Sequence, residues 1–246
     1  MTRSATRPRI GIDVDHEHDG RRWVYKLPTR YVEVVIQAGG LPVLILPNDP
    51  RSPDDILADV DGLLMTGGDD IHPRVIGEEP GGRPMRLLSV QRERFVLALA
   101  ASALRREASF PILGVCLGAQ ALNVAGGGDL CLDLYSEGTA LHEHRSGAEH
   151  SVLPEPGGRI DAFFGGQPQR PVSHHHQAVR RLGAGFVVDA RAEDGVIESF
   201  RDPQRAFLLA VQWHPEAQAA SRGGAVIITA LVEAARRARA CGEREQ

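Results

Sequence analysis

Short apolar runs alternate with helical patterns along the first half of the chain. Four runs have the length expected of strands: Arg9–Val14, Leu41–Leu46, Gly62–Met65 and Pro111–Val115. Between them, apolar residues recur at helical spacing in Pro28–Ala38 and in Ser89–Arg106. Strands separated by helical crossovers predict an α/β fold with a mostly parallel central sheet covered on both faces.

The pattern changes after about residue 130. Three closely spaced runs, Phe186–Ala190, Val196–Phe200 and Ala206–Trp213, resemble strands joined by tight turns, which predicts an antiparallel extension of the sheet. A last helix is expected from Ser221 to Ala240, with Ile227, Leu231 and Ala235 on one face. Because neither a linker nor an internal repeat interrupts this order, we expect one domain over residues 1–246.

Composition narrows the class of protein. The 246 residues suffice for one α/β domain, and a hydrophobic content of 42% with a charged content of 24% is ordinary for a globular protein. A net charge of -4 gives no support for a nucleic-acid partner, and no run is apolar enough for a signal peptide or a membrane span. Three cysteines without a disulfide framework indicate a cytoplasmic location.

The most informative segment surrounds Cys116. An apolar strand runs directly into this cysteine, and a helical pattern begins directly after it. Gly114 and Gly118 flank the cysteine at the positions where a sharp strand-to-helix turn leaves no room for side chains. Such a turn presents the thiol at the carboxyl edge of the sheet and against the positive end of a helix, which favours a thiolate nucleophile.

A buried structural cysteine is the alternative for any single cysteine. The two flanking glycines favour a nucleophile at Cys116. Cys131 and Cys241 have neither a flanking glycine pair nor a helix start, so both are interpreted as non-catalytic.

A thiol nucleophile needs a histidine base and a group that orients the histidine. His214 and Glu216 follow an apolar strand and are two residues apart, so they would project to the same side of an extended chain. Alone, a His-Pro-Glu sequence is more often a surface turn. Together with the cysteine turn it predicts a triad of Cys116, His214 and Glu216.

These residues match a known family. Gly114-Val-Cys-Leu-Gly-Ala-Gln120 resembles the nucleophile motif of class I glutamine amidotransferases, and Gln212-Trp-His-Pro-Glu216 resembles their His/Glu motif. The remaining motifs resemble gamma-glutamyl hydrolases of the gamma-glutamyl-GABA hydrolase type (peptidase C26). They are Thr66-Gly-Gly-Asp-Asp-Ile-His-Pro73, His150-Ser-Val152, His175-His-Gln-Ala-Val179 and Ala192-Glu-Asp-Gly-Val-Ile-Glu198.

The resemblance implies a flavodoxin-like three-layer sandwich and cleavage of a gamma-glutamyl amide bond through a thioester on Cys116. It further implies that backbone N–H groups of Gly68 and Leu117 form the oxyanion hole, and that Gln120 and His175 contact the substrate. The implied partner is a small gamma-glutamyl compound, without a cofactor. The chain could form a homodimer.

Two residues depart from the resembled branch. Leu117 stands where many gamma-glutamyl-GABA hydrolase-like sequences have Arg, as in the glutaminase branch, and Pro171-Val172-Ser173 lacks the Asn of a Val-Asn-Ser stretch. Both departures leave the predicted triad intact and concern the choice of substrate.

Other functions are compatible with parts of the sequence. The chain could be the glutaminase subunit of an amidotransferase that passes ammonia to a synthase, or a binding or regulatory protein that keeps the fold without turnover. His174-His175-His176, with His142, His144 and His150, could indicate a metal site. Because consecutive residues of an extended chain point to opposite faces, the triplet is a poor ligand set, and the sequence predicts no metal. The glycine-rich stretches lack the lysine and spacing of nucleotide sites.

Overall fold

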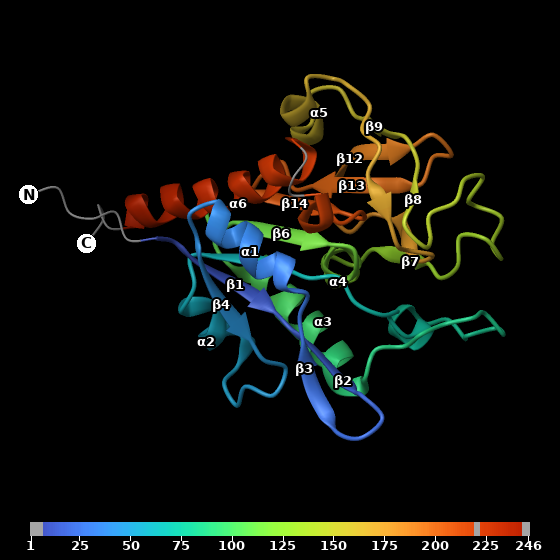
Figure 1. Cartoon of the computed structure of the whole chain (residues 1–246), viewed down its shortest axis with the longest axis horizontal. Helices are drawn as coiled ribbons and strands as arrows, with labels where there is room; N and C mark the ends of the chain where they lie inside the picture. The colour runs from blue at the N-terminus through green and yellow to red at the C-terminus, as the bar shows by residue number, and fades with distance from the viewer. Residues whose placement is uncertain (1–6, 219–221, 243–246) are drawn as a thin grey trace, which may run out of the picture.

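The computed structural model describes residues 7–218 and 222–242, and its helices and strands form three layers (Figure 1). The strands are β1 (Arg9–Asp13), β2 (Asp15–His18), β3 (Trp23–Lys26), β4 (Leu41–Ile45), β5 (Gly62–Met65), β6 (Ile112–Val115), β7 (Asp129–Cys131), β8 (Ala148–Glu149), β9 (Val152–Pro154), β10 (Val172–Ser173), β11 (Ala178–Arg181), β12 (Val187–Ala192), β13 (Ile197–Arg201) and β14 (Leu208–Val211). The helices are α1 (Thr29–Gln37), α2 (Pro53–Ala58), α3 (Val90–Arg105), α4 (Leu117–Ala125), α5 (Arg159–Phe164) and α6 (Arg222–Gly242), with short 3₁₀ turns η1 (Pro73–Ile76) and η2 (Pro215–Gln218).

The central sheet has a parallel part and an antiparallel part. Its main path runs β4-β1-β5-β6-β14-β13-β11-β7, and β12 and β9 join beyond β13. The five strands from β4 to β14 are parallel, and taken in chain order they give the arrangement 2-1-3-4-5 of flavodoxin-like folds. The pairs β14·β13, β13·β11 and β11·β7 are antiparallel. The predicted fold class is therefore confirmed.

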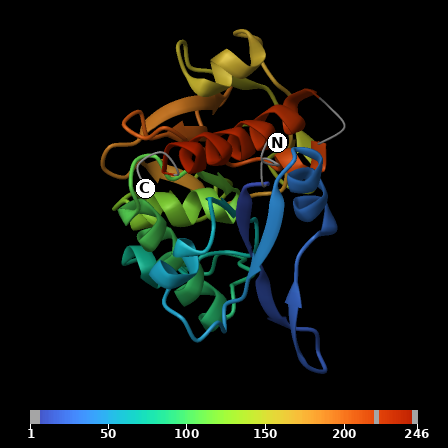
Figure 2. The ribbon, with the colours of Figure 1, turned by 90° about the vertical axis from the view of Figure 1, so that its left-hand side faces the viewer.

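Each face of the sheet buries its own set of apolar side chains. On one face α2, α3 and α4 cover a core that includes Leu57, Leu99 and Leu122. On the other, α1 and α6 cover a core that includes Tyr31 and Leu231. Figure 2 shows α1 and α3 on opposite sides of the sheet. Because the central strands β5, β6 and β14 are covered on both faces, they consist of continuous apolar runs, as the sequence pattern indicated.

The predicted elements agree with the structure to within about two residues at most ends. Ile227, Leu231 and Ala235 are buried on one face of α6, and Ser221, where this helix was expected to begin, lies outside the described residues. The hairpin of β2 and β3, which has polar residues on both strands and projects from the sheet (Figure 1), was not predicted. Among the described residues, no helix combines the length and the hydropathy that a membrane span requires.

Candidate active site

The predicted site residues lie where the parallel strands end. Thr66 follows β5, Cys116 follows β6, and Gln212 follows β14. β5 and β14 are the two neighbours of β6, so the three segments meet at one point of the carboxyl edge. This edge is where open α/β sheets form their sites.

Cys116 has an unusual backbone. Its φ of 50° and ψ of -107° place a non-glycine residue in a sparsely populated region, as at other strained strand-to-helix turns. A Cβ atom on Gly118 would lie 2.5 Å from the carbonyl oxygen of Met65, and one on Gly114 would lie 2.9 Å from the backbone nitrogen of Ala119. Side chains are therefore excluded on both sides of the cysteine, for the reason that the sequence suggested.

His214 connects the cysteine to a carboxylate. Its Nδ1 lies 2.7 Å from Oε1 of Glu216. Burial alone would lower the pKa of His214, but hydrogen bonding to Cys116 and Glu216 outweighs burial and raises the pKa to about 10. The local backbone differs from the expected extended chain, because Pro215 begins the 3₁₀ turn η2 and Glu216 reaches back to the histidine from within that turn.

The turn after β5 packs directly against these side chains. A Cβ atom on Gly67 would lie 2.7 Å from Cε1 of His214, and one on Gly68 would lie 2.6 Å from Cδ2 of Leu117. Leu117 is the first residue of α4, where backbone N–H groups lack intrahelical acceptors. Gly68 and Leu117 thus lie in contact beside Cys116, and the oxyanion hole expected from their backbone N–H groups stays a prediction.

A buried ion pair forms hydrogen bonds with the turn that follows β5. Asp13 and Arg92 are both fully buried and form a salt bridge. The other carboxylate oxygen of Asp13 accepts a hydrogen bond of 2.7 Å from the backbone N–H of Thr66, and Arg92 donates to the Thr66 hydroxyl at 3.2 Å. Neither Asp13 nor Arg92 was a predicted site residue, because the two partners are far apart along the chain.

Two glutamines lie beneath the cysteine. The side-chain amide of Gln212 donates to Sγ of Cys116 at 3.5 Å. Gln120 is buried, and its amide nitrogen donates to the carbonyl of Gln177 at 3.1 Å and to Oε1 of Gln212 at 3.3 Å. Gln120 therefore supports the site from within, and its contact with a substrate stays a prediction. Gln212 was part of a quoted motif, but its role went unnoticed.

The three consecutive histidines face three different partners. His174 is exposed, and its ring lies edge-on to His214 with 5.8 Å between centroids. His175 is buried and directed towards Glu198, and His176 lies 2.9 Å from Asp70. His174 is thus the member of the triplet beside the predicted triad. The substrate contact expected for His175 stays a prediction.

A cavity of about 220 Å³ opens next to His214 and Glu216. Its walls come from the β2–β3 hairpin, the start of α1 and the turn after β5. Charged residues of both signs line it: Asp15, Glu17, Lys26, Asp69, Arg86 and Glu216. Several are paired across the cavity, with Lys26 3.0 Å from Glu17 and Arg86 3.1 Å from Asp69.

Fold and site together place the chain among the class I glutamine amidotransferase-like proteins. The family model of peptidase C26 matches residues 8–216, and the chain belongs to that family.

Similar proteins carry names from two branches. The chain is 38% identical over 228 residues to a candidate glutamine amidotransferase of Mycobacterium tuberculosis, covering 86% of this chain and 70% of the relative. It is 34% identical over 228 residues to the gamma-glutamyl-gamma-aminobutyrate hydrolase PuuD of Escherichia coli K12, covering 85% of each. Among solved structures, a candidate GMP synthase component of Thermoplasma acidophilum superposes with a TM-score of 0.65 at 16% identity, covering 97% of this chain and 98% of that one, which supports the fold alone.

Proposed function

We propose that this chain hydrolyses a gamma-glutamyl amide bond through a thioester on Cys116, with His214 as acid and base and Glu216 as its orienting carboxylate. The observation that carries the proposal is a histidine bonded to Glu216 and packed at Gly67 together with Cys116, a strained cysteine on a helix N-terminus. A raised histidine pKa keeps a proton on the ring at neutral pH, ready for the leaving amine.

The proposed reaction has two halves. The sulfur of Cys116 attacks the amide carbonyl carbon, and the oxygen takes up negative charge beside the backbone N–H groups of Gly68 and Leu117. The C–N bond breaks as the imidazolium of His214 gives its proton to the departing amine. The neutral imidazole then takes a proton from water, and the resulting hydroxide attacks the thioester. Glutamate leaves, and the thiolate and imidazolium are restored.

The cavity suits a zwitterionic glutamyl group. Such a group carries an ammonium and a carboxylate, and the cavity offers acidic residues such as Asp15 and Glu17 together with Lys26 and Arg86. Because Glu17 is now paired with Lys26 and Arg86, a zwitterion can exchange with these existing pairs and leave no charge uncompensated. The gamma-glutamyl-GABA hydrolase relative gives a specific first substrate to try.

The test is release of glutamate from a panel of gamma-glutamyl amides, including gamma-glutamyl-GABA and glutamine. Cys116→Ala should abolish turnover, and Cys131→Ala, which removes another buried cysteine, should retain it. Turnover that persists in Cys116→Ala would refute the nucleophile.

A glutaminase subunit is the second candidate, favoured by the names of the amidotransferase relatives. In that case glutamine alone would release glutamate, and the chain would co-purify with a synthase. Hydrolysis of gamma-glutamyl amines by the isolated chain excludes an obligate synthase subunit.

A further inference from the structure

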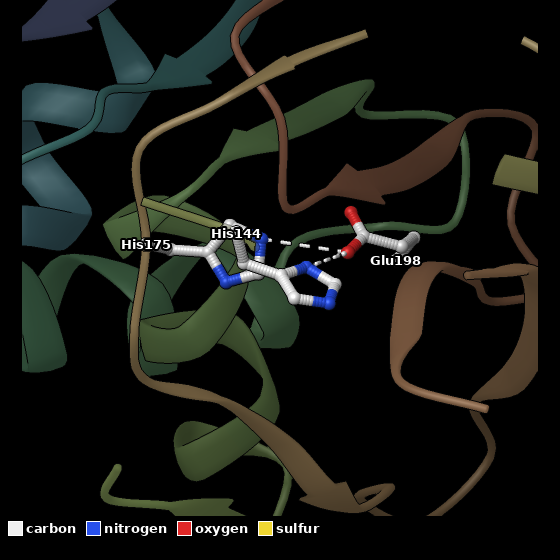
Figure 3. A group of neighbouring side chains, drawn as sticks. All are labelled: His144, His175 and Glu198. Atoms are coloured by element: carbon white, nitrogen blue, oxygen red, sulfur yellow. Dashed lines mark ion pairs between the residues drawn. The ribbon is translucent and has the colours of Figure 1, made fainter. Parts of the chain in front are cut away.

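Three buried histidines converge at one carboxylate oxygen, that of buried Glu198, on the antiparallel side of the sheet. Glu198 lies on β13, and its Oε1 is 3.3 Å from Nδ1 of His144, 3.1 Å from Nε2 of His150 and 3.4 Å from Nε2 of His175. Figure 3 shows His144 and His175 directing ring nitrogens at Glu198. The side chains are at most 3% exposed, so water does not solvate this group.

The outer hydrogen bonds fix where two of the imidazole protons lie. Nδ1 of His175 faces the carbonyl oxygen of Gln177 at 3.1 Å, and a carbonyl only accepts, so Nδ1 carries the proton. Nε2 of His144 lies 3.0 Å from the carboxylate of Asp194 and donates to it. In the neutral rings the inward nitrogens therefore present lone pairs to the Glu198 oxygen, which repel it unless a cation lies between them.

Nε2 of His150 makes a hydrogen bond of 3.1 Å with Oε1 of Glu198, whereas the other two inward nitrogens make none with any described residue. Within the described part of the chain, Nδ1 of His144, Nε2 of His175 and Oε2 of Glu198 are buried without a hydrogen-bond partner. Buried polar atoms of this kind call for an explanation, and an unassigned ion is a common one. The donor atoms offered by His144, His175 and Glu198 all lie within 4.8 Å of one another.

We propose that His144, His175 and Glu198 bind one divalent transition-metal ion, for which zinc is the best fit, in a buried structural site, and that His150 holds Glu198 in place through the hydrogen bond between its Nε2 and Oε1. Zinc takes imidazole and carboxylate ligands at about 2.0–2.1 Å, so neighbouring donors of a tetrahedron lie about 3.3 Å apart. The separations of Glu198 Oε1 from Nδ1 of His144 (3.3 Å) and from Nε2 of His175 (3.4 Å) match this edge.

The surroundings complete a metal site. Metal-bound histidines typically donate their second N–H to a carboxylate or a carbonyl, as His144 does to Asp194 and His175 does to Gln177. The charges balance as well. The two carboxylates of Glu198 and Asp194 neutralise a divalent ion surrounded by neutral imidazoles, whereas a net buried charge would be costly.

The site would join segments that have little regular structure. His144 lies in the loop between β7 and β8, His150 directly follows β8, and His175 lies just after β10. A metal would tie these loops to β13, and Gln177, which accepts from Gln120, lies two residues after His175. The ion would thereby stabilise the segment around Gln177, which supports the candidate active site. It would not touch a substrate, because none of the four clustered residues lines the cavity beside His214.

The first test is metal content. The full chain, purified in chelator-treated buffer, should contain one zinc ion per molecule by elemental mass spectrometry. Glu198→Gln, which keeps the shape and removes the charge, should lose the ion. His142→Ala should retain it, because His142 lies in the same loop as His144 but is 46% exposed and directed at Glu193.

The second test does not depend on a folded variant. Stripping the wild-type chain with a strong chelator should lower Tm, and added Zn²⁺ should restore it. Substitution by Co²⁺ should give the visible absorption of a tetrahedral ion. A protonated cluster that needs no ion would show no stoichiometric metal and no response of Tm to zinc. Equal metal retention in Glu198→Gln and loss in His142→Ala would mean surface binding. A metal-free protonated cluster and surface binding would each overturn the proposal, whatever the substrate assays give.

Discussion

The hydroxyl oxygen of Tyr31 accepts a hydrogen bond of 3.0 Å from the backbone N–H of Gly67. This contact ties α1 to the turn that carries one proposed oxyanion donor. Burial and the neighbouring charge of Glu216 raise the pKa of Tyr31 well above its ordinary value, so the phenol stays neutral at every working pH.

Tyr31→Phe should therefore loosen the turn without changing its packing. A hydrogen bond of this kind contributes about 1 kcal/mol, so we expect kcat to fall by about five- to tenfold with a small change in Tm. Steady-state kinetics on the best gamma-glutamyl substrate measure the effect. Tyr25→Phe on the exposed strand β3 is the control, and an equal loss there would contradict a specific role for Tyr31.

Glu216→Gln should shift the pH dependence of catalysis. The proton on His214 leaves with the amine, so wild-type kcat should fall as the pH rises through about 10. Without the carboxylate the same decline should begin at lower pH, and kcat should drop by a factor of about 10² to 10⁴. Profiles from pH 6 to beyond 10 measure both effects, and an unshifted alkaline limb would count against the assigned role of Glu216.

The same histidine makes stability depend on pH. Because its pKa is raised from 6.5 to about 10 on folding, its contribution is fully present below pH 6.5 and is lost as the pH rises through 10. Urea unfolding across this window should show a smaller decline for Glu216→Gln than for the wild type. Parallel curves for the two proteins would refute this linkage.

For the buried pair of Asp13 and Arg92, we expect a single substitution to lower the free energy of unfolding more than the double substitution does. Arg92→Met leaves a buried carboxylate unpaired and should cost about 3–5 kcal/mol of unfolding free energy, whereas Asp13→Asn with Arg92→Met should cost clearly less. A double-mutant cycle by urea unfolding measures the coupling. Additive losses would mean that the pair does not stabilise the turn.

The two buried cysteines should differ in reactivity. Burial, followed by the influence of Glu137, raises the pKa of Cys131 to about 11, so its thiol stays protonated at neutral pH. Cys116, next to the protonated His214, should react first with iodoacetamide. Peptide mapping of a Cys241→Ser variant identifies the labelled residue, and preferential labelling of Cys131 would contradict this assignment.

Local patterns in the sequence did not indicate the strands β7, β9 and β11, but they were enough to predict most of the central sheet, most helices and the meeting of Cys116, His214 and Glu216. Each depends on neighbours along the chain: apolar runs, flanking glycines and a two-residue spacing. The interactions that hold the turn after β5 in place were not predictable in this way. Asp13 with Arg92, and Tyr31 with Gly67, join residues tens of positions apart, and only the folded sheet brings them together.

The histidines illustrate the same limit. The expectation that consecutive histidines diverge was correct for the triplet. It did not reveal that one member, His175, would meet His144 and His150 at Glu198, because β8 and β10 pair across a long connection.

The segment from Ser173 to Gln177 therefore has a fixed register, because its three histidines contact three different parts of the structure. Its first histidine lies beside His214 of the predicted triad, its second enters the buried cluster, and its third pairs with Asp70 and Asp133. Inserting or deleting one residue here would shift each histidine to the position of its neighbour without changing the His-rich composition. The same side chains would then make the wrong contacts at the candidate active site, in the buried cluster and in the loop at once.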